Sequence, residues 1–343
     1  MLKKIKVEDS IGHRLAHDLT QIIPGKFKGA AFHKGHRVRS EDLPRLLDMG
    51  KKQVYVLTLN RGEVHEDEAS RRIARAAAGP GIRLRGPREG KMDFLARIPG
   101  LLKVNAEALG KINAVGSLIF STLHSHSVVG AGQNVAGTRA IPLTLRESLV
   151  KRVEAICRRA GPVIRVLPFR KKKVGIVVTG SEFFEKRVRD RSSGIVQKKV
   201  EAYGSDVIRK AVVPDDPERI AREIRGMKAA GCNLIVATGG LSVDPDDVTL
   251  EGIKKSGAEV TCYGVPVLPG SMSAYARLGK TTILGAPACV VHDPTTALDL
   301  FLPSVLADDA ISAKEIVAMG HGGLCLKCSV CRYPVCPFGK GGR

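Results

Sequence analysis

Apolar, β-branched runs that alternate with helical segments constrain the fold of this chain most strongly, and they fill its second half. Helices are expected at 192–204, 215–231 and 295–309, the second with Asp216 as N-cap and Pro217 at its first position. This alternation predicts an α/β domain with a doubly wound parallel sheet. The expected strands are "VGIVVT" (174–179), "DVIRKAVV" (206–213), "NLIVAT" (233–238) and "TTILGAP" (281–287).

The chain of 343 residues is too long for one ordinary hydrophobic core, so more than one domain is expected. The stretch 60–92 is rich in Arg, Gly and Ala, whereas 93–145 has short apolar runs broken by glycines. A smaller mixed and β-rich region should therefore precede the parallel sheet. The expected domains are an N-terminal α+β segment (1–60), a basic connector with a small β domain (61–170), the sheet domain (171–310) and a cysteine-rich tail (311–343).

The formal net charge of +21 indicates a surface that attracts anions. A nonspecific nucleic-acid binder is one interpretation, but Trp is absent and aromatic residues make up only 4%, which leaves few platforms for base stacking. No apolar stretch approaches the roughly 20 residues that span a bilayer, and no secretion signal is recognisable. We therefore expect a cytoplasmic protein that binds small anions rather than a membrane or nucleic acid.

Two of the expected strands end in matching glycine turns, "VVTGSE" and "VATGGLS". Parallel strands deliver their carboxyl ends to the same edge of a sheet, where ligands of such domains bind. Free backbone N–H groups and serine hydroxyls at this edge could hold a phosphate or another anion. The residues concerned are Thr179, Gly180 and Ser181 in the first turn, and Thr238, Gly239, Gly240 and Ser242 in the second.

Acidic residues follow both turns. Capping of the next helix accounts for one of Asp246 and Asp247. Together with Asp244 they make three aspartates in four positions, which is more than capping needs, and beside an anion site they predict Mg²⁺. Glu182 could complete that site or move protons. Asp247 and Glu182 are therefore candidate Mg²⁺ ligands at this edge.

The same stretches resemble the molybdopterin-binding domain that molybdopterin adenylyltransferases share with molybdopterin molybdenumtransferases. The likeness covers 174 to about 305, and a weaker likeness of 30–57 to a segment preceding this domain favours the molybdenumtransferases. The motifs that carry it are "VGIVVTGSEF", "RVRDRSSGIVQKKVEAYGSDV", "NLIVATGGLSVDPDDVT" and "VLPGSM".

This resemblance implies a role in molybdenum cofactor biosynthesis. Molybdopterin or its adenylylated form would bind at the sheet edge, and molybdate would be inserted with help from Mg²⁺. Asp247 and Glu182 would be the catalytic residues, which hold the Mg²⁺ and position the attacking oxygen. A homodimer with a composite site is also implied. The pterin-binding residues would be Thr179, Gly180, Ser181, Thr238, Gly239, Gly240, Ser242, Asp190, Ser192, Pro269 and Gly270.

The sequence departs from the molybdenumtransferase pattern in places that matter for catalysis. Leu268 and Ser271 replace two lysines that the family uses for anion contact, and its N-terminal Asp-Gly-Tyr-Ala motif is not found. An alternative function is therefore a non-catalytic carrier or sensor of molybdopterin or of the molybdenum cofactor.

Four of the eight cysteines fall within twelve residues near the C-terminus: Cys325, Cys328, Cys331 and Cys336. Without a secretion signal, this cluster predicts a metal site rather than disulfides. The spacing is one residue wider than the bacterial ferredoxin run, and the second and third cysteines are too close for two zinc knuckles. An iron–sulfur cluster is the leading interpretation, zinc the second, and a redox-active thiol tail the third. The tail could also dock to an iron–sulfur molybdoenzyme.

Overall fold

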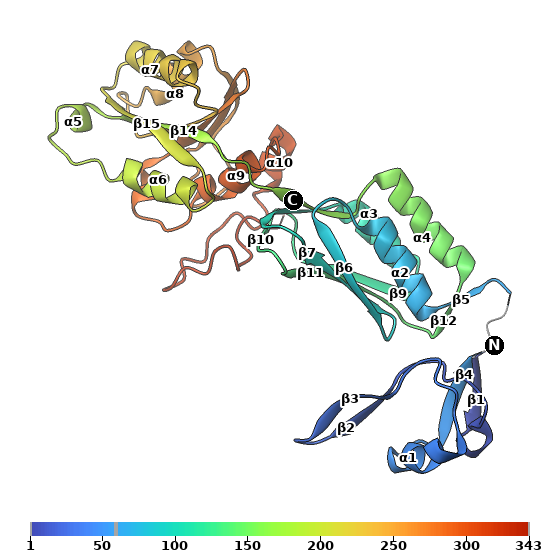
Figure 1. Cartoon of the computed structure of the whole chain (residues 1–343). Helices are drawn as coiled ribbons and strands as arrows, with labels where there is room; N and C mark the ends of the chain where they lie inside the picture. Colours follow the sequence, from blue (N-terminus) through green and yellow to red (C-terminus); the bar gives the residue numbers. More distant parts are fainter. Residues whose placement is uncertain (1, 58–60, 342–343) are drawn as a thin grey trace. The chain divides into compact units, whose positions relative to one another are not determined.

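The computed structural model describes residues 2–57 and 61–341, which form two compact units (Figure 1). The first unit contains the residues before 99 together with 104–123 and 131–166. The second contains 99–103, 124–130 and the chain from 167 onward. The domain boundary expected at residue 60 lies outside the described residues. Within the described part of the chain, no helix is long and apolar enough to span a bilayer.

The N-terminal part of the first unit is built on two strand pairs. β1 (Leu2–Lys6) pairs antiparallel with β4 (Gln53–Leu57), and β2 (Leu19–Ile23) forms a hairpin with β3 (Phe27–Phe32). The short helix α1 (Leu43–Asp48) completes this part. Its core contains Val7, Leu15, Leu46, Val54 and Val56, all of them buried.

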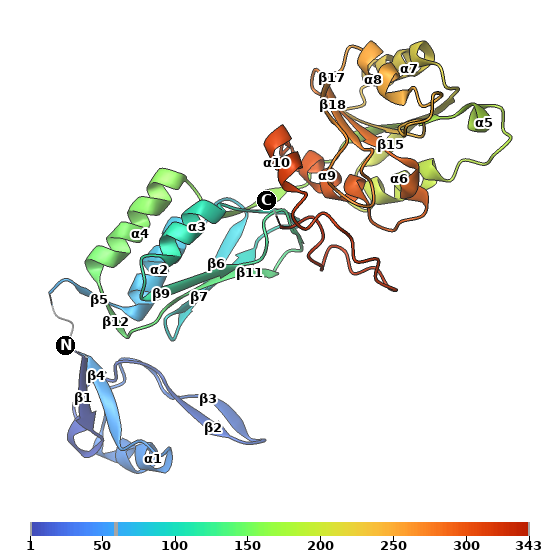
Figure 2. The same cartoon turned by 180° about the vertical axis from the view of Figure 1, so that it is seen from behind.

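The rest of the first unit is an antiparallel sheet covered by helices. The strand order is β6 (Ile82–Arg88), β7 (Lys91–Ala96), β11 (Asn134–Ala140) and β9 (Leu118–Thr122). α2 (Glu66–Ala77) packs on this sheet and α4 (Glu147–Ala160) packs on α2 (Figure 2). The further elements are β5 (Glu63–His65), which pairs with β12 (Thr144–Arg146), and α3 (Ala106–Asn113).

The basic stretch 60–92 was expected to be a connector with a basic helix. It does contain a helix, α2, but α2 and β6 are part of this sheet domain rather than of a connector. Ala69, Ile73 and Ala77 form a buried face of α2, and these mostly small side chains let the helix lie close to the strands. The arginines of α2 fall between these positions, so a helix can be basic in composition and still bury one side.

The second unit is the α/β domain predicted from the strand–helix alternation. Its sheet has the order β15-β14-β16-β19-β18-β17. The first four strands are parallel, and they are β15 (Asp206–Val213), β14 (Lys173–Thr179), β16 (Leu234–Thr238) and β19 (Thr281–Ala286). β18 (Ala274–Leu278) pairs antiparallel with β19, and β17 (Glu259–Tyr263) pairs antiparallel with β18; neither was predicted as a strand.

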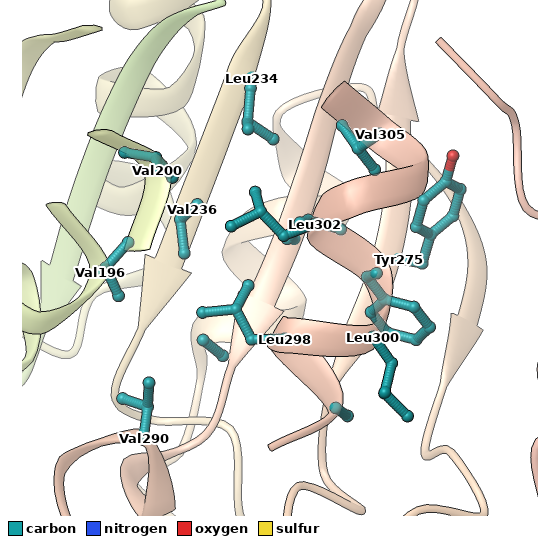
Figure 3. Close-up of a cluster of buried hydrophobic side chains, with 14 of the residues drawn as sticks. Val196, Val200, Leu234, Val236, Tyr275, Val290, Leu298, Leu300, Leu302 and Val305 are labelled. Carbon is teal, nitrogen blue, oxygen red and sulfur yellow. The ribbon is translucent and has the colours of Figure 1, made fainter. Parts of the chain in front are cut away.

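Helices cover both faces of this sheet, as a doubly wound fold requires. α6 (Ser192–Glu201) and α9 (Ala297–Leu306) pack on one face, where Val196, Val200 and Leu298 meet Leu234 and Val236 (Figure 3). α7 (Pro217–Ala229) and α8 (Thr249–Lys255) pack on the other, against Val177, Ile235 and Ala237. As predicted, Asp216 caps α7, since its Oδ1 accepts hydrogen bonds from the backbone N–H of Glu218 (2.9 Å) and Arg219 (3.1 Å).

Shorter elements complete the second unit. β8 (Gly100–Val104) pairs with β10 (Val128–Val129), and β13 (Ile164–Pro168) leads into the α/β domain along the chain. α5 (Ser181–Phe184) is a single turn directly after β14. α10 (Ala313–Ala318) precedes the cysteine-containing tail, which has no helix or strand in its described residues, up to 341.

Candidate functional site

A cleft with a volume of about 1200 Å³ opens at the carboxyl edge of the parallel strands. β14 and β16 are neighbours in the sheet, so their two glycine turns lie next to each other at this edge, as the sequence predicted. The cleft is lined by residues 179–183, Arg187, Asp215, 239–242, 244–247, 268–272 and 287–289. Segments that are far apart in the sequence therefore meet at one place in the fold.

Buried threonines connect the two turns through hydrogen bonds. Thr179 Oγ1 lies 2.7 Å from Thr249 Oγ1, and Thr179 Oγ1 also donates to the Thr238 carbonyl oxygen (3.3 Å). All three side chains are at most 1% exposed. Thr238, expected to contact the pterin, is therefore a buried residue outside the cleft lining, and Thr179 joins the turns as well as lining the cleft.

The glycines of the second turn are required by packing within the protein. Gly239 has a φ of +93°, and a Cβ there would lie 2.2 Å from the Thr179 carbonyl oxygen. Gly240 has a φ of +51°, and a Cβ there would lie 2.6 Å from Thr249 Oγ1. Both positions therefore exclude larger residues even without a ligand, because the two turns come so close together.

The first turn is held by an acid that the sequence analysis missed. The Ser181 backbone N–H donates to Asp215 Oδ2 (2.7 Å), and the Asp215 N–H approaches Ser181 Oγ at 3.4 Å. Gly180 stands before α5 with a φ of +143° and offers no side-chain cap, so Asp215 caps α5 from the neighbouring strand. Glu182, in the same turn, is half-buried and lines the cleft. Asp215 lies two residues after the end of β15 at the same sheet edge, and that position was the available signal.

The acidic loop 244–247 lies at the mouth of the cleft. Asp247 Oδ2 accepts a hydrogen bond from the Asp244 backbone N–H (3.2 Å). The expectation that Asp246 or Asp247 caps the next helix is wrong, because Val248 occupies the N-cap of α8 and no side chain caps that helix. The Asp247 carboxylate is instead half-buried beside Ser242 and the other loop acids.

The segment 268–272 forms another wall of the cleft, so Pro269 and Gly270 line it as the resemblance implied. Gly270 has a φ of +109°, and a Cβ there would lie 2.6 Å from the Ala297 backbone nitrogen at the start of α9. Leu268 is 54% exposed, and Ser271 also lines the cleft. The two positions of the missing lysines therefore face the cleft and bring no charge to it.

The cleft is acidic although the protein as a whole is basic. Its lining contains the five acids Glu182, Asp215, Asp244, Asp246 and Asp247. Among the described residues that line it, Arg187 is the only basic one. Burial raises the pKa of the Tyr263 hydroxyl, and the nearby Asp247 carboxylate raises that pKa further. A polyanionic ligand would meet net negative charge here unless a cation accompanied it.

Besides Thr238, two more of the predicted pterin-binding residues, Asp190 and Ser192, lie outside the cleft lining. Asp190 Oδ1 accepts hydrogen bonds from Ser192 Oγ (2.7 Å) and the Ser193 backbone N–H (3.1 Å) at the start of α6. Burial raises the pKa of Asp190, but these hydrogen bonds outweigh it and hold the pKa below its usual value. Asp190 borders a neighbouring hollow with Phe183 and Phe184 instead. The "RDRSS" segment is thus arranged as a helix start.

The four tail cysteines line one cavity of about 220 Å³ in the second unit. Cys325 and Cys336 are half-buried, whereas Cys328 and Cys331 are exposed. In the part of the chain that the structure describes, no three of their sulfurs lie within 4.8 Å of one another. The cysteines thus share a cavity without converging on a single point.

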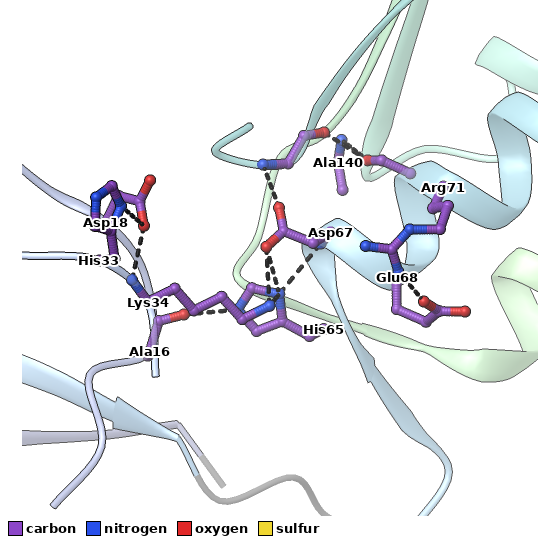
Figure 4. A network of polar contacts seen from close by, with 11 residues as sticks. Ala16, Asp18, His33, Lys34, His65, Asp67, Glu68, Arg71 and Ala140 are labelled. Carbon is purple, nitrogen blue, oxygen red and sulfur yellow. Dashed lines mark hydrogen bonds and ion pairs between the residues drawn. The ribbon is translucent and has the colours of Figure 1, made fainter. Parts of the chain in front are cut away.

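One other group in the described chain brings three potential metal ligands within 4.8 Å, namely His65, Glu66 and Asp67 in the first unit. Lys34 already occupies the cation position, with its Nζ 2.6 Å from His65 Nδ1 and 2.9 Å from Asp67 Oδ2 (Figure 4). His65 Nε2 contacts the Ala16 carbonyl oxygen at 2.6 Å. His65 and Asp67 already make these contacts within the protein, and we do not assign a metal to this group.

Comparison with protein families identifies the domain that carries the cleft. Residues 175–307 match the family described as "Probable molybdopterin binding domain". The chain therefore contains a molybdopterin-binding domain, and the resemblance read from residues 174 to about 305 is confirmed. Residues 4–58 match a second family, described as a domain of unknown function (DUF8806).

Individual relatives are similar over parts of the chain. A CinA-like protein of Mycobacterium leprae is 36% identical over 83 residues, which are 24% of this chain and 19% of that protein. The chain thus spans about a fifth of that curated relative's length. Among solved structures, the molybdopterin biosynthesis enzyme MoaB of Thermus thermophilus is 19% identical, with 39% of this chain and 91% of that chain covered and a TM-score of 0.32. The molybdopterin biosynthesis Mog protein of Mycobacterium ulcerans is 20% identical, with 40% and 99% covered and a TM-score of 0.33.

Proposed function

We propose that the cleft binds molybdopterin in adenylylated form and that the protein acts in molybdenum cofactor biosynthesis, cleaving the phosphoanhydride bond as molybdate is inserted. The observation that carries this proposal is the meeting of two Thr-Gly turns and five carboxylates in one cleft at the carboxyl edge of the sheet. The second turn can offer backbone N–H groups to phosphate oxygens, whereas in the first turn the Gly180 and Ser181 N–H groups donate to the Val213 carbonyl oxygen and to Asp215. The volume of about 1200 Å³ is ample for a nucleotide-linked pterin.

The donor set of the cleft fits Mg²⁺, because carboxylate oxygens are the hard ligands that this ion prefers. Asp247 and Glu182 are the residues that we expect to hold it, with Asp244 and Asp246 contributing charge from the same loop. Bound there, Mg²⁺ would neutralise phosphate charge that the cleft itself repels. This requirement follows from the acidic lining, which only Arg187 offsets among the described lining residues.

The protein's own residues position the reacting groups. Asp215 holds the turn that presents Glu182, and the Thr179–Thr249 contact holds the two turns in register. Glu182 would orient a water molecule and accept its proton, while the water oxygen forms a bond to phosphorus and the bridging P–O bond breaks, which releases AMP and molybdopterin. Arg187 would contact a phosphate from the rim of the cleft. Catalysis would then rest on positioning and charge compensation.

The test is AMP release from adenylylated molybdopterin by the full chain, measured with and without Mg²⁺ and in the presence of molybdate. Asp247→Ala should lower the rate by about 10²- to 10³-fold, the usual cost of removing one preorganised electrostatic group. Asp206→Ala is the matched control, since Asp206 is exposed at the opposite end of β15. Undiminished, Mg²⁺-dependent AMP release by Asp247→Ala would refute the assignment of that residue.

A second candidate function is a carrier or sensor that binds molybdopterin without turnover. It is favoured by Leu268 and Ser271, which line the cleft where the resemblance implies lysines. Molybdopterin retained at near-stoichiometric yield, with no AMP release from the adenylylated form, would support this candidate over the enzyme. A homodimer, a molybdoenzyme partner and a cytoplasmic location remain predictions under either function.

A further inference from the structure

The cysteine cavity is a second possible binding place in the molybdopterin-binding unit, separate from the cleft. Among the described residues, none that lines the cysteine cavity also lines the cleft. Its remaining walls are mostly apolar and include Pro294, Leu324, Tyr333 and Phe338. The proposed reaction uses none of the four cysteines, so their gathering around one space needs its own explanation.

The tail that forms this cavity is packed onto the domain. The Tyr333 hydroxyl donates to the Asp299 carbonyl oxygen (2.7 Å), and Thr295 Oγ1 lies 3.2 Å from Cys331 Sγ. Phe338 is 4% exposed and belongs to the same core as α9. A Cβ on Gly339 would lie 2.5 Å from the Leu300 side chain, so the chain presses closely on the helix. The position of the cysteines is therefore set by the fold.

The spacing of the sulfurs distinguishes between the metals that thiolates hold. Zinc binds four thiolates at about 2.3 Å in a tetrahedron, which brings every pair of sulfurs to about 3.8 Å. No three of these sulfurs, all within the described residues, lie within 4.8 Å of one another. An iron–sulfur cube holds its thiolates farther apart, at its corners, with the inorganic core filling the space between them. A cavity of about 220 Å³ lined by all four cysteines offers space for such a core.

Backbone hydrogen bonds also connect the segment that forms the cavity to the segment that forms a wall of the cleft. The Leu268 N–H donates to the Gly323 carbonyl oxygen (2.8 Å), and the Cys325 N–H donates to the Leu268 carbonyl oxygen (2.8 Å). Leu268 and Leu324 thus form a parallel β-bridge between the cleft wall and the tail. Pro269 and Gly270 follow at once in the cleft lining. A ligand that holds Cys325 in place would therefore also hold the cleft wall at 268–270 in place.

We propose that Cys325, Cys328, Cys331 and Cys336 bind a four-iron iron–sulfur cluster, and that the bound cluster fixes the cleft wall at 268–270 through the Leu268–Cys325 hydrogen bond. The four thiolates would be the only protein ligands of the cluster, and its binding involves no reaction of the protein. The consequence for a pterin in the cleft rests on the proposed function, whereas cluster binding and the ordering of the wall do not.

The test uses the full chain, purified without oxygen and reconstituted with ferrous iron and sulfide. We expect about four iron atoms and about four acid-labile sulfides per chain, with a broad visible absorption band. Cys328→Ala and Cys331→Ala change exposed residues and should abolish the band and the bound sulfide. Cys262→Ala, in β17 of the same sheet, is the matched control and should leave both unchanged. Hydrogen exchange of the peptide 266–270 should be slower with the cluster than without it.

Each result decides a separate point. One zinc per chain without sulfide, or no metal retained by the wild-type chain, would overturn the cluster assignment. Equal exchange of 266–270 with and without iron and sulfide would overturn the link to the cleft. Failure to bind molybdopterin in either form would sink the proposed function and leave the iron, sulfide and exchange results standing.

Discussion

Removal of the Asp215 carboxylate should loosen the turn that presents Glu182. Asp215 Oδ2 accepts from the Ser181 backbone N–H at 2.7 Å, the length of a charge-assisted hydrogen bond. Such a bond contributes about 2 kcal/mol, whereas a neutral one contributes about 1 kcal/mol. α5 has only four residues and no cap of its own, so the loss should appear as local opening of this turn.

Hydrogen exchange monitored by mass spectrometry on the peptide 178–185 measures that opening. In Asp215→Ala a loss of about 2 kcal/mol corresponds to roughly 30-fold faster exchange. In Asp215→Asn the side chain keeps an oxygen acceptor, so the loss falls to about 1 kcal/mol and the acceleration to roughly fivefold. The exchange rate of 178–185 should therefore increase in the order wild type, Asp215→Asn, Asp215→Ala.

The neighbouring residue supplies the control. Asp216 caps α7 through the N–H groups of Glu218 and Arg219, so Asp216→Ala should speed exchange at 217–220 and leave 178–185 unchanged. Unchanged exchange of 178–185 in Asp215→Ala would show that the hydrogen bond does not hold the turn. Equal acceleration there in both alanine variants would show a general loosening of the domain, and would refute the reasoning in the same way.

Three further predictions concern the two units separately. Thr179→Val and Thr249→Val should each lower the free energy of unfolding, measured with urea, by about 1–2 kcal/mol. In the double variant the loss should be about 1 kcal/mol smaller than the sum of the two single losses. Additive losses would mean that the 2.7 Å contact between the two hydroxyls contributes no coupling. Arg187→Ala should weaken binding of adenylylated molybdopterin in titrations about fivefold, as expected of an exposed charge pair, whereas Arg191→Ala, outside the cleft lining, should not. In the first unit, burial and then the Asp67 carboxylate raise the pKa of Glu66 from its ordinary value of 4.5 to about 7. Because the folded state keeps a proton that the unfolded chain loses, stability should be full below pH 4.5 and fall by about 3 kcal/mol as the pH rises to about 7. Unfolding measured against pH should lose this slope in Glu66→Gln, and a slope that persists would assign it to another group.

The contrast between the basic chain and its acidic cleft bears on all proposals for the site. A net charge of +21 suggested a protein that attracts anions everywhere. The cleft instead gathers five carboxylates against one guanidinium among its described lining residues. Long-range attraction can bring a phosphate-bearing ligand to the surface, whereas the binding that we propose in the acidic cleft would need an accompanying cation. Dependence of binding on Mg²⁺ is therefore a sharper test of the site than dependence on salt.

The sequence by itself determined the four parallel strands of the second unit and the helices α6, α7 and α9, because their signals are local. Buried parallel strands are continuous apolar runs, and a cap such as Asp216 acts on the N–H groups two and three residues ahead. Once β14 and β16 were recognised as parallel, their two glycine turns had to reach the same edge, so most of the cleft residues could be named in advance.

Tertiary structure decided what depends on contacts between distant segments. It turned Asp215 toward Ser181, 34 residues away, while the adjacent Asp216 became a helix cap. In the folded protein Asp247 does not cap α8, and the basic stretch 60–92 is part of a sheet domain. β18 and β17 extend the parallel sheet through antiparallel pairing. Tertiary structure also spread four closely spaced cysteines around a cavity. A local pattern states which side of an element is buried, but the partner that buries it is chosen only when the whole chain packs.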